Sequence, residues 1–357
     1  MAPRALVAER SIVVTTGTGG VGKTTIAAAL ALDGARMGRR ACVVTVDPAK
    51  RLADALGIGA LGNTPTRIDG DWPGELWALM LDTKGTFDDL VHRYAATEEQ
   101  ARSILDNRLY RNISSALSGT QEYMAMEKLY ELHDSGRFDL IVVDTPPTRH
   151  ALDFLEAPNR LTRFLDNRIF RLLIMPTRAY LRAVSAATHA FLRTVSRVVG
   201  TEVVSDVITF FEAFEGMEAG FRDRAASVRE LLSAPETAFA LVTSPRRDAV
   251  EEASFFAARL AEADIDVALL VVNRLHPDFG GPAVPDADAV RAPASPLESL
   301  RRNLADFHRV AAQEEGNFAA LADRLAPAPV VRVPFLPDDV HDLDGLALVA
   351  EHLTASG

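Results

Sequence analysis

One stretch near the start of the chain combines glycines, a lysine and two threonines in a spacing suited to phosphate chemistry. Residues 17–25 read Gly-Thr-Gly-Gly-Val-Gly-Lys-Thr-Thr and fit the pattern G-x-x-x-x-G-K-T. In that pattern the glycines let backbone N–H groups curl round a polyphosphate, the lysine reaches the outer phosphates and the next threonine binds Mg²⁺. The pattern predicts a nucleoside triphosphate site whose contacts come from Gly17, Gly19, Gly20, Val21, Gly22, Lys23, Thr24 and Thr25.

The segments on either side of this loop support the prediction. An apolar run at 12–14 precedes the loop and a helix-like run at 26–30 follows it. A helix that begins at the loop adds the positive end of its dipole to the phosphate site. A glycine-rich hairpin is the alternative, but it explains neither the Gly-Lys-Thr sequence nor the strand and helix around it.

Two acidic residues are placed to complete such a site. Asp47 follows the apolar run 41–46, and Asp144 follows the apolar run 140–143. A bound triphosphate requires a metal, and carboxylates at the ends of neighbouring strands hold it directly or through water. We expect Asp144 to hold Mg²⁺ and Asp47 to orient or deprotonate the attacking water, with Lys23 as the catalytic cation. Taken alone, either acid fits a helix cap equally well; Asp82 keeps that interpretation.

Strands and helices alternate along the chain. Further strand-like runs occur at 76–81, 238–243, 267–272 and 330–333. Such alternation predicts an α/β fold, in which a mostly parallel sheet is covered by helices on both faces. Helical insertions at about 84–136 and 151–235 form an inserted helical subdomain, and a Pro- and Asp-rich loop spans about 275–297. We expect one ATPase domain over residues 1–357.

The composition excludes several classes of protein. The 357 residues carry a net charge of −11, which disfavours a general nucleic-acid-binding surface. Cys42 is the single cysteine, so an internal disulfide or a cysteine-based metal site within one chain is excluded. Neither a leader segment nor a run of ~18 apolar residues is present, and we therefore expect a cytoplasmic protein.

Together these motifs resemble the ArsA/GET family of P-loop ATPases. The loop at 17–25, the segment Thr45-Val46-Asp47-Pro48-Ala49 and the segment 144–150 resemble its P-loop, switch I and switch II. The family includes arsenite-pump ATPases and ATPases that target tail-anchored membrane proteins. The resemblance implies ATP and Mg²⁺ as cofactors, a dimer that couples nucleotide state to the helical subdomain, and adenine contacts from Asn273, Pro334 and Phe335.

The chain departs from the family pattern at one loop position. Thr18 stands where the family has a lysine that reaches the phosphates of the partner subunit. A hydroxyl cannot neutralise charge on the transferring phosphoryl group, and comparable groups contribute ~10³ or more in rate. We expect an isolated chain to bind MgATP but hydrolyse it slowly, or to act as a subunit of a heterodimer with a lysine-bearing paralogue. Arg149, Lys50 and Arg51 are either compensating cations or surface charges.

The helical insertions contain two further patterns. Apolar residues recur at helical spacing between 207 and 231, which suits either core packing or a groove for an apolar client helix. A basic segment at 168–197 suits either a solvated face or contact with a membrane or acidic partner. From the resemblance to the ArsA/GET family, a membrane-protein client or a membrane partner is our leading expectation. The alternatives are a ParA/MinD-like positioning ATPase and a small-molecule kinase or ligase related to dethiobiotin synthetases.

Overall fold

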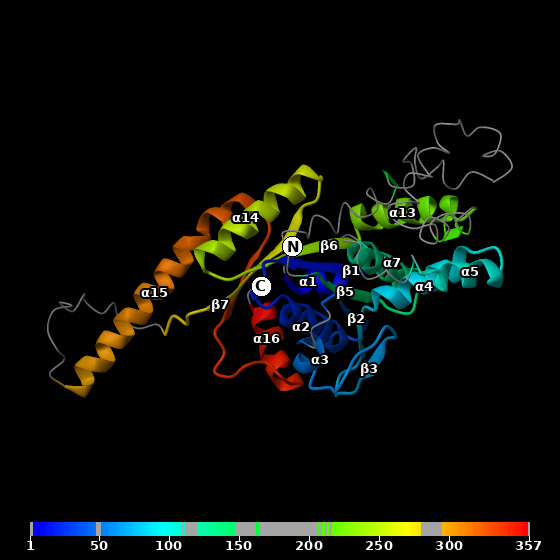
Figure 1. The fold of residues 1–357 in the computed structure, drawn as a ribbon. Helices are drawn as coiled ribbons and strands as arrows, with labels where there is room; N and C mark the ends of the chain where they lie inside the picture. The colour runs from blue at the N-terminus through cyan, green and yellow to red at the C-terminus, as the bar shows by residue number, and fades with distance from the viewer. Residues whose placement is uncertain are drawn as a thin grey trace. The chain divides into compact units, whose positions relative to one another are not determined.

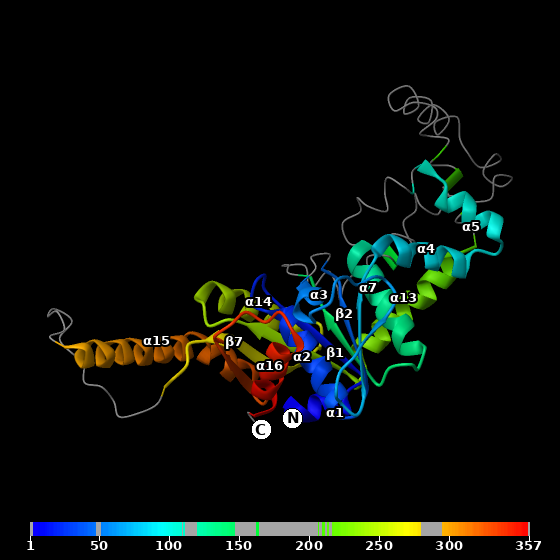
Figure 2. The same cartoon turned by 90° about the horizontal axis from the view of Figure 1, so that it is seen from below.

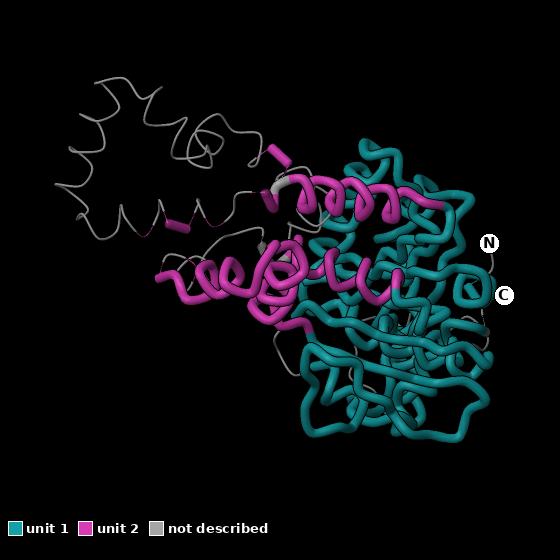
Figure 3. Tube along the Cα trace, turned by 90° about the vertical axis from the view of Figure 1, so that its right-hand side faces the viewer, with its two compact units in different colours: residues 1–80, 135–152, 235–357 teal, residues 81–134, 153–234 magenta. Residues whose placement is uncertain are grey.

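The computed structural model describes residues 3–47, 51–108, 110, 120–146, 162–163, 206, 209–210, 213, 216–279 and 295–355. The chain divides into two compact units, which Figure 3 distinguishes by colour. Unit 1 comprises residues 1–80, 135–152 and 235–357, and unit 2 comprises residues 81–134 and 153–234.

Unit 1 contains a sheet of eight strands among its described residues, in the order β3-β4-β2-β5-β1-β6-β7-β8 (Figure 1). The strands are β1 (Ile12–Gly17), β2 (Arg40–Thr45), β3 (Thr66–Ile68), β4 (Glu75–Met80), β5 (Leu140–Asp144), β6 (Thr237–Thr243), β7 (Val267–Leu275) and β8 (Val330–Pro334). Every neighbouring pair is parallel except β3 and β4. The predicted α/β fold with a mostly parallel sheet is thus confirmed.

Helices lie on both faces of this sheet (Figures 1 and 2). On one face lie α1 (Pro3–Glu9), α2 (Lys23–Arg36), α3 (Arg51–Ala55) and α16 (Leu343–Ala355), and on the other lie α14 (Arg247–Glu262) and α15 (Pro296–Leu325). All six residues of β1 and all five of β5 are buried. Strands buried on both faces read as continuous apolar runs, which is why the sequence reveals them.

The small residues of helix α2 favour helix formation and allow the helix to lie close to the sheet. Its sequence is rich in alanine, which has the highest intrinsic helix propensity. Residues 26–35 are all buried, and a Cβ added at Gly34 would lie 2.6 Å from Cδ2 of Leu140 on β5. The helix therefore packs closely against the sheet, so the loop that joins it to β1 is held at both ends by the core.

Unit 2 is helical in its described residues. It contains α4 (Thr83–Tyr94), α5 (Glu98–Leu105), α7 (Thr120–Asp134) and α13 (Glu218–Ser233). Asp82 caps α4 by accepting a hydrogen bond from the Lys84 N–H, as expected. Arg224 on α13 donates to Glu127 on α7 at 2.7 Å, and both side chains are buried. An ion pair of this kind is costly to break on one side only, because the remaining charge stays buried.

The apolar pattern at 207–231 falls partly within the described residues. Its described members Phe210, Met217, Phe221, Val228 and Leu231 are all buried, which supports the core-packing interpretation. The basic segment 168–197 lies outside the described residues.

The loop predicted at 275–297 is bounded by longer elements than expected. Strand β7 continues through Leu275, and α15 begins at Pro296 after the N-cap Ser295, which accepts a hydrogen bond from the Glu298 N–H. Serine at the N-cap, proline at the first helical position and glutamate two residues later are common at helix starts. The sequence therefore contained a signal for the start of α15. Among the described helices, none combines the length and apolar character needed to cross a bilayer.

Candidate nucleotide-binding site

The loop between β1 and α2 has a backbone that glycine alone accommodates well. Gly20 and Gly22 have φ values of 79° and 94°, in the left-handed region. Gly17 has φ of 148°, and a Cβ there would lie 2.0 Å from the Val242 carbonyl oxygen on β6. The glycines at these positions are therefore required by backbone conformation and by close contact with the next strand.

The first turn of α2 is open toward this loop. Gly22 is its N-cap and makes no side-chain capping bond, so no cap side chain occupies the free N–H groups of the first turn. Lys23, 6% exposed, donates from Nζ to the Thr18 carbonyl oxygen at 2.8 Å. Burial lowers the pKa of Lys23 to about 8, although Asp144 and Asp47 oppose that shift. The loop thus combines free N–H donors with a buried amine, which suits a phosphate ligand.

Asp144 is held beside this loop by the register of the sheet. The parallel pairing places it level with Thr15 on β1 and Thr45 on β2. Its Oδ2 accepts hydrogen bonds from Thr24 Oγ1 at 2.7 Å and from Thr45 Oγ1 at 2.8 Å. Its Oδ1 is buried and has no hydrogen-bond partner among the described residues. Burial raises the pKa of Asp144 to about 6, because these hydroxyls and Lys23 offset only part of the desolvation.

The Oδ1 atom of Asp144 shows whether Asp144 and Thr24 are suited to hold a magnesium ion. A buried carboxylate oxygen without a partner is costly, and a cation or its bound water would satisfy it. Thr24 supplies a hydroxyl beside the same carboxylate. The described residues contain no cluster of three or more His, Cys, Asp or Glu side chains arranged for a metal. Magnesium does not need one, since it keeps several waters and takes substrate phosphates as ligands. The residues therefore fit Mg²⁺ bound together with a triphosphate.

Asp47 lies at the end of the next strand in the sheet. Its carboxylate is 14% exposed and forms an ion pair with Arg51 at 3.5 Å. Its backbone N–H donates to Thr45 Oγ1 at 3.2 Å, so Thr45 contacts both acidic residues. Arg51 is thereby placed next to Asp47, whereas Lys50 and Arg149 lie outside the described residues.

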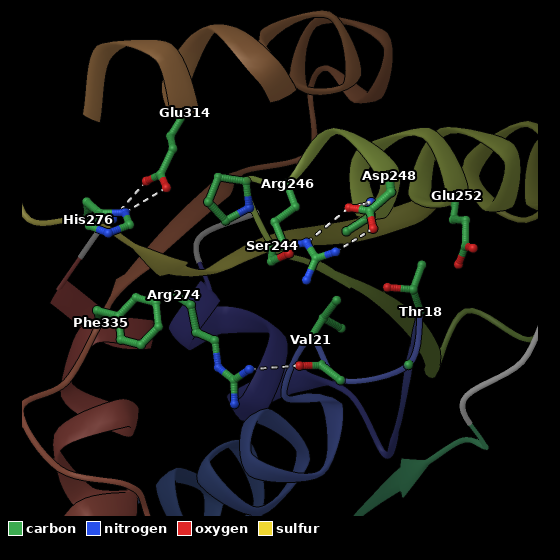
Figure 4. Close-up of a pocket in the computed structure, with 14 residues that line it drawn as sticks. Thr18, Val21, Ser244, Arg246, Asp248, Glu252, Arg274, His276, Glu314 and Phe335 are labelled. Atoms are coloured by element: carbon green, nitrogen blue, oxygen red, sulfur yellow. Dashed lines mark hydrogen bonds and ion pairs between the residues drawn. The ribbon is translucent and has the colours of Figure 1, made fainter. Parts of the chain in front are cut away.

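A cavity of about 680 Å³ adjoins the outer side of the loop (Figure 4). It is lined by Thr18, Gly19, Gly20, Val21, Ser244, Pro245, Arg246, Asp248, Ala249, Glu252, Arg274, His276, Glu314 and Phe335. Phe335 is 52% exposed and offers an aromatic face to a ligand. Of the three expected adenine contacts, Phe335 lines the cavity while Asn273 and Pro334 do not. Asn273 instead donates from Nδ2 to the Val21 carbonyl oxygen at 2.8 Å.

Several polar residues of this region were not found from the sequence. Thr45 opens the segment that resembles switch I, but its contact with Asp144 was not predicted, because that contact depends on the sheet register. Arg246 pairs with Asp248 at 2.7 Å, and His276 pairs with Glu314 of α15 at 2.7 Å. Both pairs line the cavity. His276 and Glu314 are far apart in sequence, and Arg246 and Asp248 belong to no recognised motif. Residue spacing therefore could not identify either pair.

The pKa shifts of Lys23 and Asp144 predict opposite proton exchange on binding MgATP. At pH 8.5 we expect proton uptake, because phosphate charge raises the pKa of Lys23 from about 8. At pH 6 we expect proton release, because a cation beside Asp144 lowers its pKa from about 6. Titration calorimetry in buffers of different ionisation enthalpy measures both, after subtraction of the protons exchanged by MgATP itself. Equal proton exchange at the two pH values would contradict the assignment.

Comparisons with known proteins show which family the chain resembles. The family model described as anion-transporting ATPase matches residues 10–282. The uncharacterized protein SCO2128 of Streptomyces coelicolor is 30% identical over 296 residues, covering 82% of this chain and 67% of that protein. ATPase GET3B of Arabidopsis thaliana is 29% identical, covering 73% of this chain and 63% of its own length. ATPase ARSA1 of Chlamydomonas reinhardtii is 29% identical, with 75% and 35% covered.

Proposed function

The chain belongs to the family of anion-transporting ATPases, and on that premise we propose that it is a dimeric switch that binds and hydrolyses MgATP. Because the chain spans only about a third to two thirds of the length of the relatives compared, their activities and partners come to it as proposals. The observation that carries the proposal is Asp144, which is buried, accepts a hydrogen bond from Thr24 of the loop and has one carboxylate oxygen without a partner in the described part of the chain.

Each residue of the site has a role in the proposed hydrolysis. The loop N–H groups and Lys23 bind the β- and γ-phosphates, and Lys23 exchanges its bond to the Thr18 carbonyl for phosphate oxygens. Thr24 and Asp144 hold Mg²⁺, which neutralises charge on the phosphates when bound. Asp47 accepts a proton from water as the water oxygen bonds to the γ-phosphorus and the bond to ADP breaks. The products are ADP and inorganic phosphate.

Thr18 favours a second candidate function. Thr18 is 5% exposed, and its carbonyl oxygen accepts a hydrogen bond from Lys23 Nζ. Because Thr18 is uncharged, Lys23 is the single cationic side chain in the sequence of residues 17–25. A loop with one cation neutralises less of the transition-state charge than a loop with two. The second candidate is therefore a weakly hydrolysing subunit of a heterodimer, in which a paralogue supplies the second cation.

We propose that ATP binding and hydrolysis in the site are coupled to the helical unit 2. A membrane-protein client or a membrane partner remains the leading candidate for what it binds. The buried state of Phe210, Met217, Phe221, Val228 and Leu231 argues that this apolar row stabilises the helices themselves. Client contact would then rest on other surfaces of the helical unit.

Single-turnover hydrolysis tests the proposal. With the protein in excess over ATP, we expect binding of MgATP but turnover well below the ~1 per second typical of efficient phosphoryl-transfer enzymes. Asp47→Asn is the matched control: it keeps the side-chain size and removes the base, so binding should persist while hydrolysis falls further.

Addition of a co-encoded paralogue separates the two candidates. Acceleration by the paralogue supports the heterodimer, and unchanged slow turnover supports the isolated switch. Rapid turnover by the chain alone would contradict the role given to Thr18. Failure to bind MgATP at all would overturn the proposed function.

A further inference from the structure

Two consecutive residues at the end of β7 donate hydrogen bonds from their side chains to backbone carbonyl oxygens of the phosphate loop. Asn273 donates from Nδ2 to the Val21 carbonyl oxygen at 2.8 Å. Arg274 donates from its guanidinium to the Gly20 carbonyl oxygen at 3.0 Å, and Figure 4 shows its side chain extending to the loop. The end of β7 thus binds two successive peptide units, 20–21 and 21–22.

The geometry of a trans peptide converts these contacts into an orientation of N–H groups. In a trans peptide unit the C=O and the N–H point in opposite directions. A carbonyl of Gly20 held by Arg274 therefore turns the N–H of Val21 away from β7, and a carbonyl of Val21 held by Asn273 does the same for the N–H of Gly22. With Gly20 and Gly22 in the left-handed region, successive N–H groups can form a concave anion site.

The strand end is itself arranged for these contacts. Arg274 has φ of 63°, a conformation that is unfavourable for a residue with a long side chain. Its N–H donates to Asn273 Oδ1 at 3.0 Å, which ties the two residues together. A Cβ on Gly22 would lie 2.3 Å from Asn273 Nδ2, so the approach of Asn273 requires the glycine. Three separate features of the backbone and side chains thus serve the same pair of hydrogen bonds.

We propose that Asn273 and Arg274 are positioning residues of the phosphate loop, which hold its Val21 and Gly22 N–H groups toward the bound phosphates. This inference rests on the proposed nucleotide-binding function. It differs from the expected adenine contact of Asn273, whose Nδ2 and Oδ1 are both engaged in the contacts described above and whose side chain is 8% exposed. It also gives Arg274 a role that acts through the loop, although its side chain lines the cavity.

A ligand without a base separates positioning of the loop from contact with the base. Arg274→Asn is the main variant, because asparagine tolerates a left-handed backbone while it lacks the guanidinium. We expect it to weaken binding of MgATP and of magnesium tripolyphosphate by the same factor, about tenfold. Phe335→Ala, on the cavity wall, is the matched control and should weaken MgATP binding only. Arg274→Lys keeps a donor and should restore part of the affinity for both ligands.

Hydrogen exchange in the ligand-free protein gives an independent measurement. In Arg274→Asn we expect faster exchange of the Val21 and Gly22 amides, with the unfolding temperature of the protein retained. Weaker binding of MgATP alone, or unchanged exchange at both amides, would overturn the inference. If the parent protein binds neither MgATP nor tripolyphosphate, the proposed function fails, and the exchange rates alone still decide whether Arg274 positions the loop.

Discussion

Replacement of Lys23 by alanine is expected to lower the affinity for MgATP at least a hundredfold. Lys23 is the buried amine of the loop, with Nζ 2.8 Å from the Thr18 carbonyl oxygen. On binding, it gives charge-assisted hydrogen bonds to phosphate oxygens, and each such bond contributes about 1.5–3 kcal/mol. Loss of two bonds corresponds to about two to four powers of ten in affinity. Titration calorimetry measures the loss, and affinity within a factor of ten of the parent value would contradict the role of Lys23.

The same residue is expected to destabilise the ligand-free fold at neutral pH. Burial lowers its pKa to about 8 from the ordinary 10.5. Below pH 8 the folded protein carries the buried charge in full, and this penalty fades as the pH rises from 8 to 10.5. Lys23→Met keeps the apolar stem and removes the charge, so its unfolding temperature at pH 7 should equal or exceed that of the parent. A loss of binding with retained stability therefore reports on the phosphate contact alone.

The sequence predicted the parts of the site that depend on local pattern or on strand ends. The loop at 17–25 is recognisable because its glycines, lysine and threonine act within one turn. Asp47 and Asp144 were predicted as site residues because the carboxyl ends of parallel strands meet at one edge of a sheet. The parallel pairing of β2 with β5 brings Asp144 level with Thr45, two residues before Asp47, as that argument requires.

The parts that were not predicted depend on contacts between distant segments. Asn273 and Val21 are 252 positions apart, and their hydrogen bond depends on the registers of β1 with β6 and of β6 with β7 rather than on any motif. Strand β3 has three residues, two of them exposed, so it leaves almost no apolar pattern. The apolar row at 207–231 has the same spacing whether it lines a groove or a core, and burial in the folded chain is needed to choose.

Replacement of Asp144 by asparagine is expected to remove the magnesium dependence of nucleotide binding and to lower hydrolysis at least a hundredfold. The amide keeps the size of the side chain, and its oxygen can still accept from Thr24 and Thr45. It loses the negative charge and turns an N–H₂ group toward the position of the free Oδ1. Affinity for ATP in the presence of EDTA should change little, whereas the gain on adding Mg²⁺ should disappear.

The unfolding temperature of Asp144→Asn is a second test of this role, and it needs neither ATP nor Mg²⁺. The pKa of Asp144 is raised to about 6 from 3.8, so between these values the folded state binds more protons than the unfolded state. This carboxyl therefore destabilises the fold as the pH rises from 4 to 6, by an amount on the order of a few kcal/mol at neutral pH. The neutral amide lacks this penalty, and the variant should unfold at a higher temperature than the parent at pH 7 but not at pH 4. A lower unfolding temperature at pH 7 would mean that the carboxylate stabilises the ligand-free site, which would contradict a position kept for a cation.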